Sequence, residues 1–99
     1  MPKLKQIAYQ ELRRITERTE RKVVRDANTG NYMEVFERVP FRLWYVAANG
    51  DMIQGEECVT IAVYPERRSR MVRFTASGQI RRIRDIAILR VDDWRIVYR

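Results

Sequence analysis

The first twenty residues show apolar positions at a helical period. One apolar stripe recurs at helical spacing and is formed by Leu4, Ile7, Ala8, Leu12 and Ile15. A stripe of this kind is typical of a helix that packs on a core with one face. Pro2 suits the first turn of such a helix. The pattern predicts an amphipathic helix over about residues 3–20.

Beyond this segment the apolar period changes to two, which is typical of half-buried strands. The alternation is clearest from Met33 to Tyr45, and Pro40 interrupts it, so we expect a bulge or a sheet edge there. Turn-forming residues occur at 26–30, at Asn49-Gly50 and at Ser77-Gly78. Further strands are predicted at 23–24, 58–64, 71–76, 86–91 and 94–98.

One helix followed by closely spaced short strands predicts an α+β fold. We expect residues 22–98 to form a five- or six-stranded antiparallel meander. A small bent sheet or a partly closed barrel is the natural form, because closure hides the strand edges. The 99 residues match the usual size of a single domain, and no linker, repeat or low-complexity segment divides them.

The net charge of +7 arises entirely in the last third of the chain. Residues 1–66 carry ten Lys or Arg and ten Asp or Glu, whereas residues 67–99 carry ten Arg and three Asp. A GC-rich genome raises arginine content everywhere. It explains why seventeen of the twenty basic residues are arginine, but not why the charge is so unevenly distributed.

The arginines of the last third predict a surface that binds phosphate. Arginine grips phosphate through a rigid fork, and a cluster of arginines releases counterions when it meets nucleic acid. The strands before and after Ser77-Gly78 are expected to pair, which would bring their arginines together. The predicted nucleic-acid-binding residues there are Arg67, Arg68, Arg70, Arg73, Arg81, Arg82 and Arg84.

Arg42 and Trp44 complete the predicted surface, because they share one face of the strand at 41–47. An exposed tryptophan beside arginine can stack a base of single-stranded nucleic acid. The alternative is that Trp44 is buried under the N-terminal helix, with the Arg42 side chain extending along its edge.

The sequence thus predicts a small non-enzymatic protein that binds DNA or RNA. The alternative is an interaction or assembly module, for example from a phage or other mobile element. Its arginines would then meet an acidic protein or another copy of the chain, forming a homo-oligomer. Nucleic-acid binding requires the arginines to converge beside an exposed aromatic side chain. Assembly requires an exposed apolar patch or an open strand edge.

Several kinds of chemistry are disfavoured by composition. The chain has no histidine, no phosphate-binding glycine motif and one cysteine, Cys58, so we expect no cofactor, no metal and no catalysis. Cys58 is expected to be a small buried apolar residue. The longest apolar run has six residues and the N-terminus has no apolar signal core. We therefore expect a cytoplasmic protein without a membrane segment.

The segment VDDWRIVY at residues 91–98 resembles a strand pair of small ribosome-dependent RNase toxins. The resemblance implies an RNase that relies on arginine and tyrosine instead of histidine. In those toxins the pair follows a two-helix hairpin, whereas here it follows many predicted strands. Our main expectation stays non-enzymatic.

Overall fold

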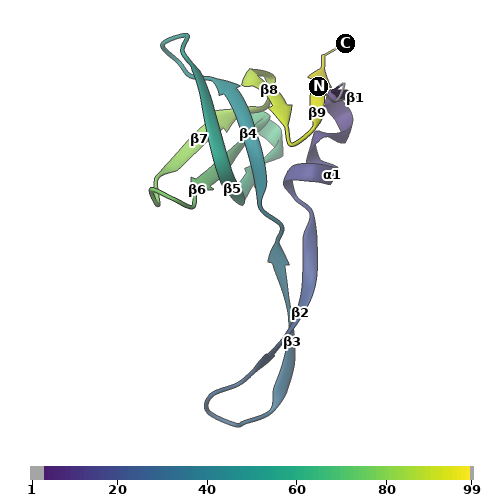
Figure 1. The fold of residues 1–99 in the computed structure, drawn as a ribbon, viewed down its shortest axis with the longest axis vertical. Coiled ribbons are helices and arrows are strands. Elements are labelled where there is room, and N and C mark those ends of the chain that lie inside the picture. The colour runs from purple at the N-terminus through teal and green to yellow at the C-terminus, as the bar shows by residue number, and fades with distance from the viewer. Residues whose placement is uncertain (1–3, 99) are drawn as a thin grey trace.

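The structure is a computed structural model that describes residues 4–98. Figure 1 shows a curled sheet from which a two-stranded ribbon projects. We call the ribbon, residues 19–38, the arm, and the remainder the body. The molecule measures 49 × 31 × 28 Å, and the arm extends along the longest axis.

The chain begins with strand β1 (Lys5–Ala8), a 3-10 turn η1 (Tyr9–Glu11) and helix α1 (Leu12–Thr16). The arm consists of β2 (Thr19–Arg25) and β3 (Tyr32–Arg38). The body continues with β4 (Phe41–Val46), β5 (Met52–Tyr64), η2 (Pro65–Arg67), β6 (Ser69–Phe74), β7 (Ile80–Arg84), η3 (Asp85–Ala87), β8 (Ile88–Val91) and β9 (Trp94–Val97).

The body sheet has seven strands in the order β1-β9-β8-β4-β5-β6-β7. Its pairs are antiparallel except for β1 and β9, which run parallel. The sheet is therefore larger than the expected meander, mixed in direction, and not closed into a barrel. Its two outer strands are β1 and β7.

The N-terminal helix is much shorter than expected. Between residues 4 and 20, only Leu12–Thr16 is α-helical, and its buried residues Leu12 and Ile15 confirm that part of the apolar stripe. Ile7 instead lies in a strand opposite Ile96 of β9 and is buried there. Pairing with β9 gives this backbone hydrogen-bond partners outside its own segment, so long-range contacts outweigh the helical period. The start of the expected helix, with Pro2, lies outside the described residues.

The core lies on the inner face of the curled sheet. The alternation predicted along β4 is confirmed, because Phe41, Leu43 and Tyr45 are all buried. The other buried apolar residues come from the N-terminal segment and from β5 to β9: Ile7, Leu12, Ile15, Cys58, Val72, Ile83, Ile88, Val91 and Ile96. None of these residues belongs to the arm.

The interruption expected at Pro40 is present and separates two sheets. Val39 and Pro40 lie between β3 of the arm and β4 of the body. Proline has no N–H to donate to a strand partner, which favours a break in the ladder at this point. The predicted turns at Asn49-Gly50 and Ser77-Gly78 are confirmed, since both glycines adopt positive φ angles.

Candidate functional site

The arm presents two faces that can be assigned from its strand register. In an antiparallel ribbon, residues directly opposite each other project from the same face. One face of the arm is formed by three such pairs: Arg21–Phe36, Val23–Glu34 and Arg25–Tyr32. We call this side the aromatic face of the arm; its members are Arg21, Val23, Arg25, Tyr32, Glu34 and Phe36.

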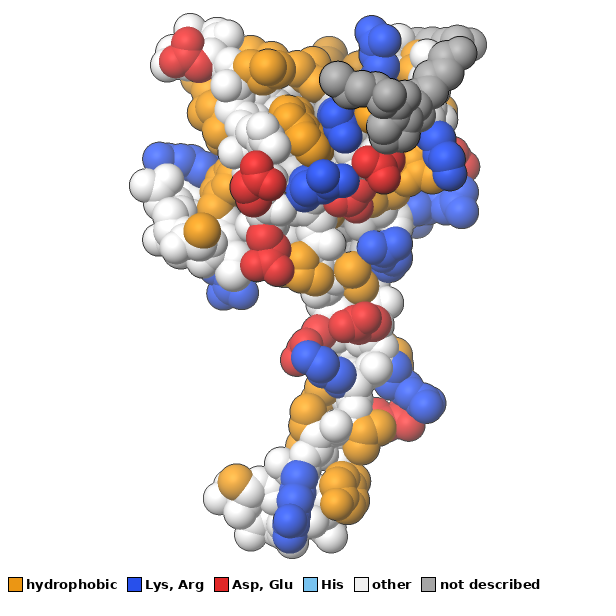
Figure 2. Space-filling model, in the orientation of Figure 1, with side chains coloured by type: hydrophobic (Ala, Val, Ile, Leu, Met, Phe, Trp, Pro, Cys, Tyr) orange, Lys and Arg blue, Asp and Glu red, His pale blue; other side chains and the backbone are white. Residues whose placement is uncertain are grey.

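Large apolar side chains of the aromatic face are open to solvent. Tyr32 is 75% exposed, Phe36 68% and Val23 59%. Figure 2 shows the arm as a narrow stalk that carries hydrophobic side chains away from the body. Exposed apolar groups gathered on one element, with charged neighbours, make the aromatic face a candidate interaction surface.

The charges of the arm cancel one another. Residues 19–38 contain four basic residues (Arg21, Lys22, Arg25, Arg38) and four acidic ones (Glu20, Asp26, Glu34, Glu37), 4 − 4 = 0. Two cross-strand pairs link them: Arg21–Glu34 at 3.2 Å and Lys22–Glu37 at 3.1 Å. All four side chains are half or more exposed, so these pairs stabilise the ribbon only weakly.

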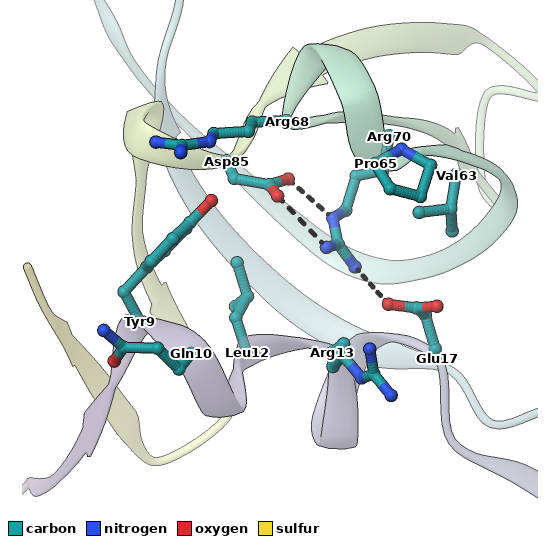
Figure 3. Close-up of a pocket in the computed structure, with 10 residues that line it drawn as sticks. All are labelled: Tyr9, Gln10, Leu12, Arg13, Glu17, Val63, Pro65, Arg68, Arg70 and Asp85. Atoms are coloured by element: carbon teal, nitrogen blue, oxygen red, sulfur yellow. Dashed lines mark hydrogen bonds and ion pairs between the residues drawn. The ribbon is translucent and has the colours of Figure 1, made fainter.

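A buried ionic cluster holds the root of the arm. The Arg70 Nε donates to Asp85 Oδ1 at 2.9 Å, and its Nη1 lies 3.5 Å from Glu17 Oε2. The same guanidinium donates to the hydroxyl of Thr16. Figure 3 shows Arg70 of β6 between Asp85 of η3 and Glu17 of the N-terminal segment. Three segments distant in sequence are joined at this point.

Glu17 also connects this cluster to the arm. The Arg38 guanidinium donates to the Glu17 carbonyl at 2.5 Å, and the Val39 N–H donates to the Arg18 carbonyl at 2.8 Å. Both ends of the arm are therefore attached at residues 17–18 and 38–39. Because Arg70 is 3% exposed and charge-paired, the direction in which the arm leaves the body is set by a buried contact.

Three of the predicted nucleic-acid-binding residues come together. Arg67, Arg82 and Arg84 line an open hollow of about 490 Å³ with Ser69. Within residues 4–98 none of the three arginines makes an ion pair. Arg82 also lies 4.6 Å from the ring centre of Tyr64, a cation–π contact that places an aromatic side chain beside the hollow.

The other predicted arginines of this segment are dispersed. Arg73 lines a crevice between the body and the arm root, Arg68 a pocket beside α1, and Arg81 a groove at the turn between β6 and β7. The expectation that Arg70 joins an exposed surface is wrong. It shares the inward row of β6 with Val72, and Asp85 neutralises its charge there.

Arg42 and Trp44 share the outer face of β4, as the sequence predicted. Trp44 is half-buried between Arg42 and Arg90, whose guanidinium carbons lie 5.7 and 4.1 Å from its ring. Arg42 is paired with Asp93 at 3.2 Å. Trp44 lies on β4, three strands away from β7 in the sheet, so it does not share the hollow of Arg82 and Arg84.

An apolar groove opens where β5 meets the turn between β6 and β7. Tyr45, Ile53, Phe74 and Ala76 supply much of its lining, and its volume is about 430 Å³. Glu56, Glu57 and Arg81 are exposed and also line it. Burial raises the pKa of the Tyr45 hydroxyl above its ordinary value of 10.0, so this side chain is uncharged at neutral pH.

The arm was not anticipated from the sequence, although a signal for it exists. Val23 and Val24 are adjacent, so they must point to opposite faces of a strand. Each face of β2 also carries charged residues, so neither face has the purely apolar row that a core requires. A strand of this pattern is poorly suited to a body sheet with one buried face.

Comparisons with protein-family models, curated proteins and solved structures found no match to this chain. None of the helices within residues 4–98 is long and apolar enough to cross a membrane. In the same part of the chain no three Cys, Asp or Glu side chains lie close enough together to hold a metal ion.

Proposed function

We propose that this protein is a non-enzymatic assembly module whose copies associate through the arm. The observation that carries the proposal is the exposed aromatic face, with Tyr32 and Phe36 on a ribbon that projects from the body. A two-stranded hairpin is only marginally stable in water when nothing packs against it. A partner surface that covers Tyr32 and Phe36 supplies the missing apolar contact.

Charge favours a second copy of the chain as that partner. The arm has a net charge of zero, so the whole +7 belongs to the remaining residues. Contact between two bodies brings like charges together, whereas contact between an arm and a body adds no net repulsion. An arm of one copy can therefore bind the body of another with less electrostatic repulsion than two bodies would experience.

The edges of the body sheet offer a weaker route to assembly. Strand β7 presents Arg81, Arg82 and Arg84 at one edge, and charged side chains on an edge strand oppose pairing with another strand. Strand β1 at the other edge has four residues, too few for an extended ladder. These features support the arm as the assembling element.

Sedimentation velocity over a concentration series tests the proposal. We expect the native chain to associate at micromolar concentrations and the Tyr32→Ser/Phe36→Ser variant to sediment as a monomer. Met52→Ser/Ile86→Ser is the matched control, because these body residues are 68% and 72% exposed. A native chain that stays monomeric up to about millimolar concentration, where association is worth only about 4 kcal/mol, contradicts the proposal.

Nucleic-acid binding is the second candidate function, supported by the hollow that Arg67, Arg82 and Arg84 share. In the part of the chain that the structure describes, these three arginines form no ion pair, and Arg82 lies beside Tyr64, which suits contact with a phosphate backbone. Fluorescence anisotropy with labelled single-stranded and duplex oligonucleotides across a salt series tests it.

Changing Arg67, Arg82 and Arg84 together to Glu should then weaken binding at all salt concentrations. The slope of log K against log salt should fall by about three, one for each lost phosphate contact. A control with Arg13, Arg18 and Arg95 changed to Glu alters the net charge equally at exposed sites on other elements. Equal loss in both variants, or no binding by the native chain at low salt, excludes this function.

A further inference from the structure

We infer that the aromatic face of the arm seats in the apolar groove between β5 and the β6–β7 turn of a second copy of this chain. The inference rests on the proposed function and names the surface that receives the arm. It joins two surface features of the molecule: exposed aromatic side chains on the arm and an open apolar groove on the body.

The shape of the groove suits aromatic side chains. Its volume of about 430 Å³ falls in the range of pockets that enclose drug-sized ligands, about 300–1,000 Å³. The rings of Tyr45 and Phe74 lie 6.2 Å apart at a tilt of 36° along its wall. Tilted rings at such distances accept a further ring in an edge-to-face or offset arrangement.

Gly55 allows close packing at the base of the groove. A β-carbon at this position would lie 2.6 Å from the Phe74 ring and would also collide with Cys58. Phe74 can approach the backbone of β5 only because position 55 has no side chain. Ile53 also lines the groove and is 36% exposed.

Charges on the two surfaces are complementary. Arg21 and Arg25 against Glu34 give the aromatic face a net charge of 2 − 1 = +1. Glu56 and Glu57 against Arg81 give the groove a net charge of 1 − 2 = −1. Within residues 4–98 neither glutamate forms an ion pair, and Arg25 forms none either. An apolar centre with complementary charges around it is the usual composition of a specific protein interface.

The occupant of the groove comes from another copy, because the arm points away from its own body (Figure 1). Its root is held there by Arg70, Glu17 and Arg38. Each chain then offers both an arm and a groove. Two copies can exchange arms in a two-fold dimer, or successive copies can form a closed ring or an open filament, according to the rotation between copies.

A charge-reversal experiment tests the match. The arm variant is Arg21→Glu/Arg25→Glu, and the groove variant is Glu56→Arg/Glu57→Arg. Each variant alone places like charges at the contact, so its self-association should weaken at least 30-fold. In an equimolar mixture, the acidic arm of one variant can bind the basic groove of the other, and the native arm of the second can bind the native groove of the first. We expect this mixture to recover association, measured by sedimentation and light scattering.

Cross-linking tests the contact without relying on charge. Glu34 lies on the aromatic face, and replacing it leaves Tyr32 and Phe36 in place. A mixture of Glu34→Cys and Ala76→Cys chains should form a dimer with a short bismaleimide, whereas Glu34→Cys mixed with Ile86→Cys should not. Cross-linking of Glu34→Cys to Val59→Cys in the crevice at the arm root, and not to Ala76→Cys, overturns the groove as the receiving surface.

The inference and the proposed function fail in different ways. If the native chain does not associate, the assembly role itself is wrong. A second outcome is that the native chain associates and Tyr32→Ser/Phe36→Ser abolishes association, but the mixture of charge-reversed variants stays monomeric. The proposed function of the arm then stands, and the groove is not the surface that receives it.

Discussion

Arg70 and Arg84 lie on the two strands of one hairpin but have opposite surroundings. Arg70 pairs in register with buried Ile83, and Arg84 with Ser69, so the two arginines point to opposite faces of the sheet. Arg70 is 3% exposed and bonded to Asp85, whereas Arg84 lines an open hollow. Residue type alone does not distinguish a buried, charge-paired arginine from an exposed one.

Replacing Arg70 should therefore cost far more stability than replacing Arg84. Arg70→Met leaves Asp85 buried without its partner and should lower the free energy of unfolding by about 3–5 kcal/mol. Arg84→Met should change it by less than about 0.5 kcal/mol. Urea unfolding followed by circular dichroism measures both values. Equal effects would show that the buried cluster does not hold the body together.

Cys58 makes the stability of the folded protein depend on pH in the alkaline range. Burial raises the pKa of its thiol from an ordinary value of 9.0 to about 11 in the folded state. The folded protein therefore holds this proton more tightly than the unfolded chain. The stability that this provides is full below pH 9 and is lost as the pH rises from 9 towards 11.

We expect the free energy of unfolding to fall between pH 9 and pH 11, and to fall less in Cys58→Ala. Chemical unfolding at several pH values measures the slope for both proteins. Buried tyrosines also titrate at high pH, so the comparison with Cys58→Ala isolates the thiol. Identical slopes in the two proteins would contradict the assignment.

At the scale of elements, the arm and the body depend on different interactions. Every residue of the hydrophobic core lies outside residues 19–38. The arm is instead a ribbon stabilised by strand pairing and by weak surface ion pairs. The body should fold without it, while the arm depends on the root contacts of Glu17 and Arg38.

Removing the arm should leave a folded but monomeric protein. In this variant a two-residue Asn-Gly turn joins Thr19 to Arg38, which face each other across the root of the arm. The body should keep a single cooperative thermal transition, because its core is unchanged. Differential scanning calorimetry and sedimentation velocity check the two expectations. Loss of the cooperative transition would show that the arm is part of the folding unit.

At the scale of the whole molecule, the arm and the body differ in both shape and net charge. The projecting arm is neutral and partly apolar, and the compact body carries the net positive charge. Seven residues in each strand extend the ribbon by about 23 Å, so a neighbouring copy can be reached without contact between the two bodies. Long reach and low charge are what an arm-to-body contact requires.

Hydrogen exchange should report this division directly. In dilute monomer the amides of β2 and β3 should exchange much faster than those of β4 to β6, because a hairpin without packing opens easily. On association the arm amides should become protected, together with those around Gly55 and Phe74. Unchanged exchange in the arm on association would argue against its burial by a partner.

The sequence by itself determined the local features of this protein. Alternation along β4 identified Phe41, Leu43 and Tyr45 as core residues, and the turns at Asn49-Gly50 and Ser77-Gly78 were correctly predicted. The burial of Cys58 was also correct. Each of these depends on the strand period or on the backbone preferences of a few adjacent residues, which a sequence displays directly.

Only the tertiary structure decided how distant segments meet. It turned residues 5–8 from an expected helix into a strand beside β9, and it buried Arg70 against Asp85 and Glu17. It also gathered three arginines at one hollow, dispersed the others, and extended residues 19–38 away from the body. One physical reason applies to all of these cases. Whether a charged or apolar side chain is buried or exposed depends on the residues that contact it, and those residues come from distant parts of the sequence.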